Sequence, residues 1–250
     1  MLRRIERALH RRIARWLDPL CELGSRVVEV RSAEQLRIAM GWTRVPVLRG
    51  EHLHACRQLE DVNERLLRDA EVIGAACANE GRKILLEIGT GLGLTTALMA
   101  ENAPHALVHT VNIPPEEIAD GGRFTTFAPA REQIGSHYRE RRLENVAQIF
   151  ANTAHWQPDV GPIDVAFIDG CHDADFVYED TRKVLARCRE GAVILWHDFH
   201  PGLVRVYPWI ASVATGIDRL YRDGELRGPV LHLQDSWVGL YRVPVAGDPT

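Results

Sequence analysis

The chain has 250 residues, enough for one α/β domain with an appendage or for two small domains. Hydrophobic residues make up 46% of the sequence and charged residues 26%, which are ordinary values for a globular protein and exclude a disordered chain, a collagen and a coiled-coil rod. No run approaches the 18 consecutive apolar residues of a membrane-spanning helix. The formal net charge of −4 gives no general reason to bind nucleic acid.

The cysteines and the N-terminal segment indicate in which cellular compartment the protein is expected. Five cysteines form no CxxC pair, which argues against a disulfide framework and against a structural zinc site. The opening segment MLRRIERALH is basic but has no apolar core, so it does not read as a secretory signal. We therefore expect a cytoplasmic protein with reduced thiols.

Residues 2–20 combine apolar residues at helical spacing with an arginine-rich opposite face. Such a helix either lies on anionic lipid or docks onto protein, and the second interpretation is favoured because the whole chain prefers arginine to lysine. A second helix is predicted from about 51 to 79, and the segment 79–82 then breaks the pattern. Residues 1–80 are accordingly predicted to form a helical cap or oligomerisation segment, with a homodimer expected, and residues 81–250 the main domain.

Beyond residue 80, short apolar runs alternate with helical stretches, as in βαβ units with a parallel sheet. The predicted strands are 84–88, 106–113, 146–151, 165–168 and 192–196, and the predicted helices lie near 94–102, 129–142 and 173–189. Segments 230–233 and 237–243 read as a closing hairpin or paired edge strands. The sequence predicts an α/β fold with a doubly wound, mostly parallel, seven-stranded Rossmann-like sheet and an N-terminal helical extension.

A sheet of this kind binds ligands outside the carboxyl ends of its strands, and the first of these ends carries a glycine-rich loop. Gly89, Gly91 and Gly93 alternate there, allowing a tight turn before a helix whose free N–H groups face a ligand. A nicotinamide fingerprint needs its third glycine at position 94, which is leucine. Glu87 precedes the loop; a carboxylate there opposes a pyrophosphate but suits a ligand with an ammonium group.

At this point residues 80–245 resemble the class I S-adenosylmethionine (SAM)-dependent methyltransferases, whose first motif the loop matches. The resemblance implies that this loop wraps the methionine part of SAM, and that residues after the second and third strands hold its ribose and adenine. The implied cofactor-binding residues are Glu87, Gly89, Thr90, Gly91, Gly93, Asn112, Asn152 and Thr153.

Two of these positions depart from the family pattern. Asn112 and Asn152 stand where the family usually has aspartate, which accepts stronger hydrogen bonds. Either Asn112 binds the ribose with lower affinity, or Glu116 or Glu117 reaches back, or the cofactor differs. The two asparagines together are either a coherent variant or a mark of weak binding.

The most specific pattern is FIDGCH at the end of the fourth strand of this domain, followed by a helix and then LWHDFH at the end of the fifth. It resembles small-molecule methyltransferases, including O-methyltransferases of sugars and secondary metabolites. Several of these bind a divalent cation at these strand ends, so the resemblance implies Asp169, His197 and Asp198 as ligands of Mg²⁺ or a similar ion. Asp169, His172, His197 and Asp198 are the candidate catalytic residues.

Three chemistries fit this pattern. A cation lowers the pKa of an acceptor hydroxyl with help from a histidine, or His172 or His197 alone removes the proton, or the side chains serve only as caps and hydrogen-bond partners. A thiolate role for Cys171 is disfavoured because no nucleophile arrangement surrounds it. Residues 113–124 form a long insertion that reads as a lid. Aromatic residues line an acceptor pocket or, more often at such spacing, belong to the core: Trp196, Tyr207, Trp209 and Trp237.

The sequence thus predicts SAM-dependent methyl transfer to a small molecule, most readily to a hydroxyl group. A non-catalytic nucleotide-binding or scaffold protein of the same fold is the alternative, motivated by the two asparagines. An NAD-dependent oxidoreductase is opposed by Leu94. Nucleic-acid methylation is opposed by a formal charge of −8 on residues 21–250.

Overall fold

The computed structural model describes residues 22–49, 63–120, 122–123, 125 and 127–246, with only the backbone described for 63–66. The predicted helix over 2–20 and the first part of the predicted helix over 51–79 lie outside these residues. Within the described chain, no helix combines the length and the apolar character that crossing a membrane requires.

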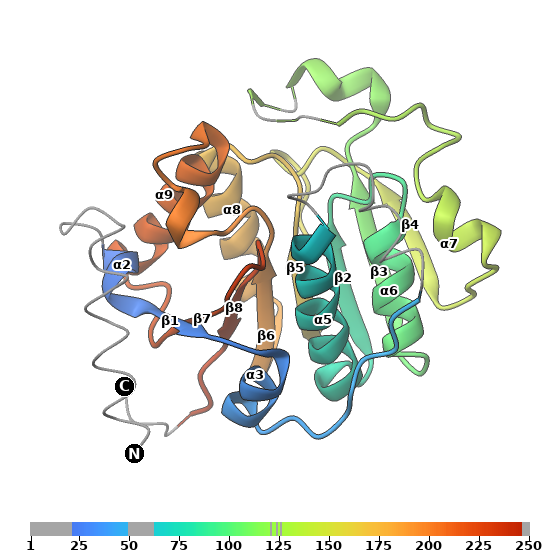
Figure 1. Ribbon diagram of the computed structural model, residues 1–250. Coiled ribbons are helices and arrows are strands. Elements are labelled where there is room, and N and C mark those ends of the chain that lie inside the picture. The colour runs from blue at the N-terminus through green and yellow to red at the C-terminus, as the bar shows by residue number, and fades with distance from the viewer. Residues whose placement is uncertain (1–21, 50–62, 121, 124, 126, 247–250) are drawn as a thin grey trace.

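One mixed sheet of eight strands organises the described chain, in the order β1-β7-β8-β6-β5-β2-β3-β4 (Figure 1). β8 pairs antiparallel with β6 and β7, and the other neighbouring strands are parallel. The strands are β1 (Val27–Val30), β2 (Ile84–Ile88), β3 (Leu107–Asn112), β4 (Val146–Phe150), β5 (Ile163–Ile168), β6 (Cys188–Trp196), β7 (Val230–Leu233) and β8 (Gly239–Arg242).

Helices cover both faces of the sheet, as Figure 1 shows. One face packs against α3 (Ala33–Met40), α5 (Asn63–Glu80) and α6 (Leu94–Asn102). The other packs against α2 (Glu22–Arg26), α8 (Ala174–Leu185) and α9 (Pro208–Arg222). The short elements α7 (Ser136–Glu140), η2 (Pro115–Asp120) and η3 (Pro201–Leu203) lie in the connections between strands and helices.

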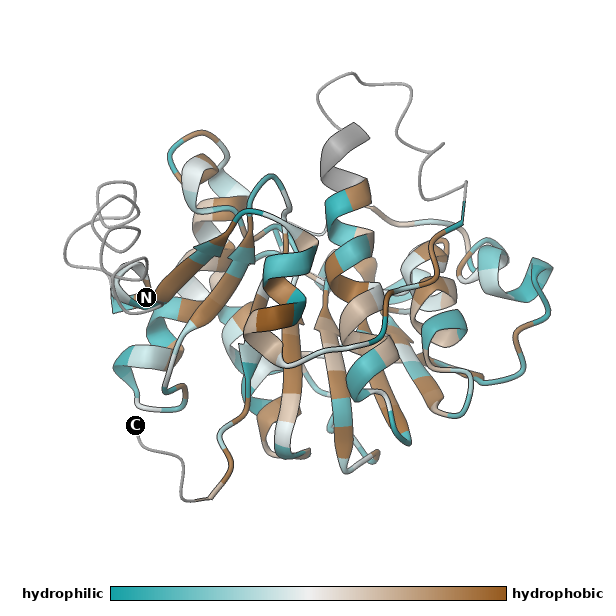
Figure 2. Ribbon diagram, turned by 60° about the horizontal axis from the view of Figure 1, so that its bottom comes forward, coloured by the Kyte–Doolittle hydropathy of each residue, from teal (hydrophilic) through white to brown (hydrophobic). Residues whose placement is uncertain are grey.

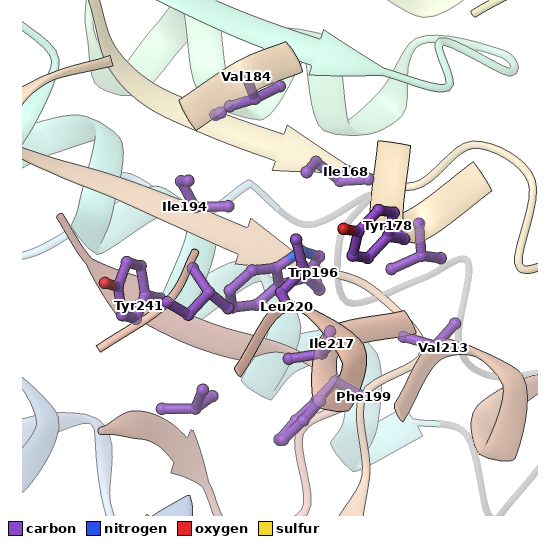
Figure 3. Packing of buried hydrophobic residues seen from close by; sticks show 14 of the residues in the cluster. Ile168, Tyr178, Val184, Ile194, Trp196, Phe199, Val213, Ile217, Leu220 and Tyr241 are labelled. Carbon is purple, nitrogen blue, oxygen red and sulfur yellow. The ribbon is translucent and has the colours of Figure 1, made fainter. Parts of the chain in front are cut away.

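Burial on both faces explains the continuous apolar runs that predicted the strands. Every residue of the central strand β5 is buried, whereas the edge strand β4 is only partly covered. Figure 2 shows the strands mainly in hydrophobic colours and the helices in mixed ones. Trp196, which the sequence left open as a pocket or core residue, is a core residue: it is 1% exposed, packs among Ile217, Leu220 and Tyr241, and donates through its indole N–H to Thr181 (Figure 3).

The structure corrects two predictions about the fold. The sheet has eight strands rather than seven, because β1 from the region predicted to be helical pairs in parallel with β7. Helix α5 contributes Val72, Ala76 and Cys77 to the same core as the sheet, and the domain boundary at residue 80 stays a prediction. The helix predicted near 129–142 is confined to α7, while α9 was not predicted.

The short strand β1 gave no recognisable signal because a four-residue apolar segment is ambiguous without its partner strand. The predicted hairpin at the C-terminal end is present as β7 and β8, which pair antiparallel. These two strands lie inside the sheet, however, and β1 forms the edge beyond them.

Candidate active site

The predicted site residues lie at the carboxyl ends of five parallel strands, β2 to β6. The sheet ladder continues one residue beyond the strands: Asp169 N donates to Ile88 O at 2.8 Å, and His197 N donates to Ile168 O at 3.0 Å. Because the backbone at these positions is held by neighbouring strands, the side chains that follow them are carried to one edge at defined places.

A cavity of about 350 Å³ opens at this edge, within the size range of ligand sites. All but one of the predicted site residues line it. The lining residues among them are Gly89, Thr90, Gly91, Gly93, Asn112, Asn152, Thr153, Asp169, His172, His197 and Asp198. The sequence therefore selected a set of residues that the fold brings together.

The glycine loop packs closely against the end of β5. Gly89 has a φ of +103°, and a Cβ atom there would lie 2.0 Å from the carbonyl oxygen of Asp169. Gly93 has a φ of +81° and begins α6 as its N-cap. Only glycine combines these conformations with such a close approach, so the loop backbone is free to approach a ligand in the cavity.

Glu87 is the predicted site residue that does not line the cavity. It is fully buried beneath the loop, where the hydroxyl groups of Thr96 and Thr110 both donate to its Oε2 atom. Burial raises the pKa of Glu87 to about 8, against the hydrogen bonds that lower it. Glu87 therefore lies underneath the glycine loop, and its contact with the cofactor stays a prediction.

Asn112 lines the cavity, but its amide is engaged with the protein. Its Oδ1 accepts a hydrogen bond from Gly91 N at 3.1 Å, and its Nδ2 donates to Ile113 O at 2.9 Å. The side chain thus ties the end of β3 to the glycine loop. Glu116 is exposed and its carboxylate pairs with Arg131 at 2.6 Å, and the alternative that Glu116 or Glu117 reaches the ribose stays a prediction.

Asn152 and Thr153 close the cavity after β4. Asn152 Oδ1 accepts from Ala154 N at 3.0 Å, which fixes the turn. Thr153 donates to Asp180 at 3.1 Å, and burial raises the pKa of Asp180 to about 7. The two positions after β3 and β4 are therefore built around asparagine amides that shape the backbone of the cavity wall.

Asp169, His172 and Asp198 form a cluster in which one ligand atom from each residue lies within 4.8 Å of the others. His172 Nε2 is 3.1 Å from Asp198 Oδ2 and 3.7 Å from Asp169 Oδ1. The sequence prediction placed His197 in this set. The cluster contains His172 in that place, while His197 lies near the same two aspartates, and its role as a ligand stays a prediction.

His197 instead lies among three carboxylates. Its Nδ1 is 3.0 Å from Asp169 Oδ1 and 3.6 Å from Asp198 Oδ2, and its Nε2 is 3.5 Å from Asp69 Oδ2. Burial by itself would lower the pKa of His197, but these carboxylates raise it well above its ordinary value. These surroundings favour the protonated form of His197, which disfavours it as the base that one of the sequence-based alternatives required.

Asp169 and His172, two members of the cluster, have pKa values shifted by neighbours of opposite charge. Burial would raise the pKa of Asp169, yet His197 and His172 hold it below its ordinary value. Burial would lower the pKa of His172, whereas Asp169 and Asp198 raise it. The cluster is thus a tight arrangement of opposite charges in a largely buried place.

Asp198 adopts a left-handed conformation, with a φ of +51°, that residues other than glycine rarely take. Its Oδ1 accepts a hydrogen bond from the indole N–H of Trp209 at 3.3 Å. Trp209 belongs to a half-buried aromatic group: the ring centroid of Tyr207 lies 4.7 Å from that of Trp209 and 5.8 Å from that of Trp237. These three aromatic side chains therefore form a group beside the cluster, and Trp209 links that group to Asp198.

Cys171 also lines the cavity, but its surroundings do not favour a thiolate. Burial raises the pKa of Cys171, and its Sγ lies 3.5 Å from Asp173 Oδ2.

Thr125 and Phe127 reach the cavity from the insertion that follows β3. Arg123 N donates to Asp173 at 2.5 Å, which fastens this insertion to the start of α8. A lid function for the insertion stays a prediction.

Comparisons with known proteins agree with this geometry. Residues 86–199 match the model of a family described as a methyltransferase domain. No curated protein sequence matches the chain. The match spans the glycine loop and both aspartate-bearing strand ends. In this segment the chain is similar to a methyltransferase domain, and its fold is shared with SAM-dependent methyltransferases.

Two solved structures share the fold over most of the chain. One is the O-methyltransferase TomG from Streptomyces achromogenes, involved in tomaymycin synthesis and solved with SAM. It is 17% identical, with 86% of this chain and 100% of TomG covered and a TM-score of 0.53. The other is the methyltransferase PaMTH1 from Podospora anserina with bound S-adenosylhomocysteine (SAH). It is 17% identical, with 85% of this chain and 95% of PaMTH1 covered and a TM-score of 0.53.

Proposed function

We propose that the protein transfers the methyl group of SAM to a hydroxyl group of a small molecule, with a divalent cation assisting at Asp169, His172 and Asp198. The observation that carries this proposal is a single one: the glycine loop and the Asp–His–Asp cluster line the same cavity. A methyl donor held by the loop and an acceptor held at the cluster would therefore meet in one cavity.

The backbone of the glycine loop, which lines the cavity, is suited to binding the methyl donor. The alternating glycines let the loop backbone line the cavity, and Gly93 begins α6, whose first N–H groups suit a carboxylate. Asn112 holds the loop in this conformation through Gly91. SAM supplies a methyl group already activated on a sulfonium, so the residues of the site have to align the acceptor and exclude water.

The side chains of the cluster are of the types that bind a divalent cation. Both ring nitrogens of His172 are buried and have no hydrogen-bond partner among the described residues, although Nε2 lies near two carboxylates. An unsatisfied imidazole beside two carboxylates is a donor set suited to Mn²⁺ or Mg²⁺. A bound cation would lower the pKa of an acceptor hydroxyl.

The protein's own residues then have separate tasks. His197 keeps its proton and pairs with Asp169, which fixes that carboxylate. Proton removal by His172 without a cation would need its neutral form, which Asp169 and Asp198 disfavour by raising its pKa. Trp209 holds Asp198 from the side of the aromatic group. The net charge of the main domain and the enclosed cavity support a small acceptor rather than a nucleic acid.

The decisive experiment is a calorimetric titration with SAH in EDTA, repeated with Mg²⁺ and with Mn²⁺, followed by a panel of small hydroxyl compounds with methyl-labelled SAM. We expect micromolar or tighter SAH binding, a separate heat for the cation, and label transfer to a hydroxyl that EDTA suppresses. Transfer unaffected by EDTA would overturn the cation, and transfer to DNA or RNA in place of the panel would overturn the small-molecule acceptor.

A further inference from the structure

Asp69, on helix α5, lies outside both strand-end motifs and yet reaches the cluster. Its side chain is 4% exposed, and its Oδ1 accepts a hydrogen bond from Trp237 N at 2.6 Å. Its other oxygen, Oδ2, lies 3.5 Å from His197 Nε2. One carboxylate therefore touches α5, the turn between β7 and β8, and the end of β6.

The imidazole of His197 connects Asp69 to the cavity. Its two ring nitrogens point in different directions, so that Nε2 faces Asp69 while Nδ1 faces Asp169 Oδ1 at 3.0 Å. Phe167 meets the ring edge to face, with centroids 5.9 Å apart and planes at 70°. The ring is thus held at both nitrogens and on one side, and its orientation decides where Asp169 directs its carboxylate.

We propose that Asp69 is a positioning residue for the cation site, acting through His197 on Asp169. The inference rests on the proposed function, because it assigns a role toward the cation that Asp169 helps to hold. Residues that orient metal ligands from outside the ligand set commonly change metal affinity by about 10- to 100-fold when they are replaced. Asp69 would thereby make α5, from the region predicted to be a separate cap, part of the site.

The replacement Asp69→Asn separates this role from a purely structural one. A carboxylate offers an oxygen to Trp237 N and another to His197 Nε2, whereas a carboxamide of the same shape offers one oxygen and one NH₂ group. If the oxygen stays with Trp237, an NH₂ group replaces the carboxylate oxygen that lies 3.5 Å from Nε2 of His197, and the ring loses that acceptor. The fold contact is kept while the link to His197 is broken.

The experiment uses the full chain and Mn²⁺ alone as the probe, with SAH binding as the test of folding. For Asp69→Asn we expect the Mn²⁺ dissociation constant to rise about 10- to 100-fold, while SAH affinity stays within about twofold. His197→Gln should reproduce the loss, and the double variant should lose no more than either single variant, since one chain of contacts is cut in each case.

Asp218→Asn is the matched control. Asp218 is also 4% exposed, lies on a helix, and accepts from a distant backbone amide, Leu23 N, at 2.9 Å. It is on α9, away from the cavity lining. We expect its replacement to lower stability but to leave Mn²⁺ and SAH affinities as in the wild type. A loss of Mn²⁺ affinity in this control equal to that in Asp69→Asn would overturn the inference.

A second readout follows the imidazole itself, in ¹⁵N spectra of protein labelled at histidine. The resonance of His197, assigned from its absence in His197→Gln, should shift in Asp69→Asn and not in Asp218→Asn. If wild-type protein binds Mn²⁺ and Asp69→Asn binds it equally well, the inference is wrong and the proposed function stands. If wild-type protein binds no Mn²⁺, the cation part of the proposed function fails, and an unshifted His197 resonance would then overturn the role of Asp69 as well.

Discussion

Asp198 Oδ2 lies 3.1 Å from His172 Nε2, although the two residues follow different strands and are separated by the whole of helix α8. The contact exists because β5 and β6 are neighbours in parallel register, with Ile168 opposite Trp196. Residues a few positions beyond these two therefore meet over the same cavity. This pairing is the centre of the proposed chemistry, and the first prediction concerns it.

Asp169→Ala and Asp198→Ala should each abolish methyl transfer while sparing cofactor binding. Both carboxylates belong to the cluster, whereas the glycine loop holds the donor, so we expect turnover to fall by at least about a hundredfold and SAH affinity to change only a few-fold. Labelled methyl transfer and SAH calorimetry measure the two effects. Asp175→Ala, at an exposed aspartate paired with Arg219, is the control, and full activity of both cluster variants would contradict the site.

Gly89→Ala should abolish SAH binding because the new Cβ atom would lie 2.0 Å from the carbonyl oxygen of Asp169. Gly224→Ala is matched to it, since Gly224 also has a positive φ, of +75°, but has nothing within 4 Å of the added atom. Gly224→Ala should cost about 1–2 kcal/mol of stability and leave SAH affinity unchanged. Unfolding curves measure the stability of each variant, and SAH titrations measure its affinity. Equal SAH affinities in the two variants would show that the close approach of Gly89 to Asp169 is unimportant for binding.

Asn112→Ala should weaken SAH binding about fivefold, because the hydrogen bond that holds Gly91 of the glycine loop is lost at about 1 kcal/mol. Asn112→Asp keeps the acceptor for Gly91 N and should stay within about threefold of the wild type. Asn145→Ala is the control, since Asn145 donates to Ala100 O and Ala106 O outside the cavity. If Asn112→Ala bound SAH as tightly as the control does, the loop would not depend on this amide.

Glu87→Gln should change how stability depends on pH. Burial raises the pKa of Glu87 to about 8, above the ordinary value of 4.5 that applies to the unfolded chain. Between these values the folded state holds a proton that the unfolded state has lost, so stability falls as pH rises, by at most about 1.4 kcal/mol per pH unit. Glutamine has no such proton, and its variant should show a flatter profile.

Urea unfolding from about pH 5 to about pH 8 measures this slope. Glu116→Gln, at an exposed glutamate paired with Arg131, should keep the wild-type slope. An unchanged slope in Glu87→Gln would mean that another group carries the pH dependence.

The order of apolar runs and breaks along the chain was sufficient to place β2 to β6, the glycine loop and the aspartates that follow β5 and β6. These features are local: a strand buried on both faces is apolar throughout, and its carboxyl end is where a ligand-binding side chain is found. For the same reason the methyltransferase class was predictable from residues 87–93 and from the two strand-end motifs.

Other features depended on contacts between distant parts of the chain. Strand β1 is defined by its pairing with β7, and Asp69 reaches His197 only because α5 packs on the sheet. Whether His172 or His197 joins the two aspartates is a matter of where each ring points, and spacing along the chain does not fix a side-chain rotamer. The sequence by itself determined which strand ends carry the chemistry, and the packing of the tertiary structure decided which side chains at those ends face one another, because rotamers and strand partners are set by neighbours remote in sequence.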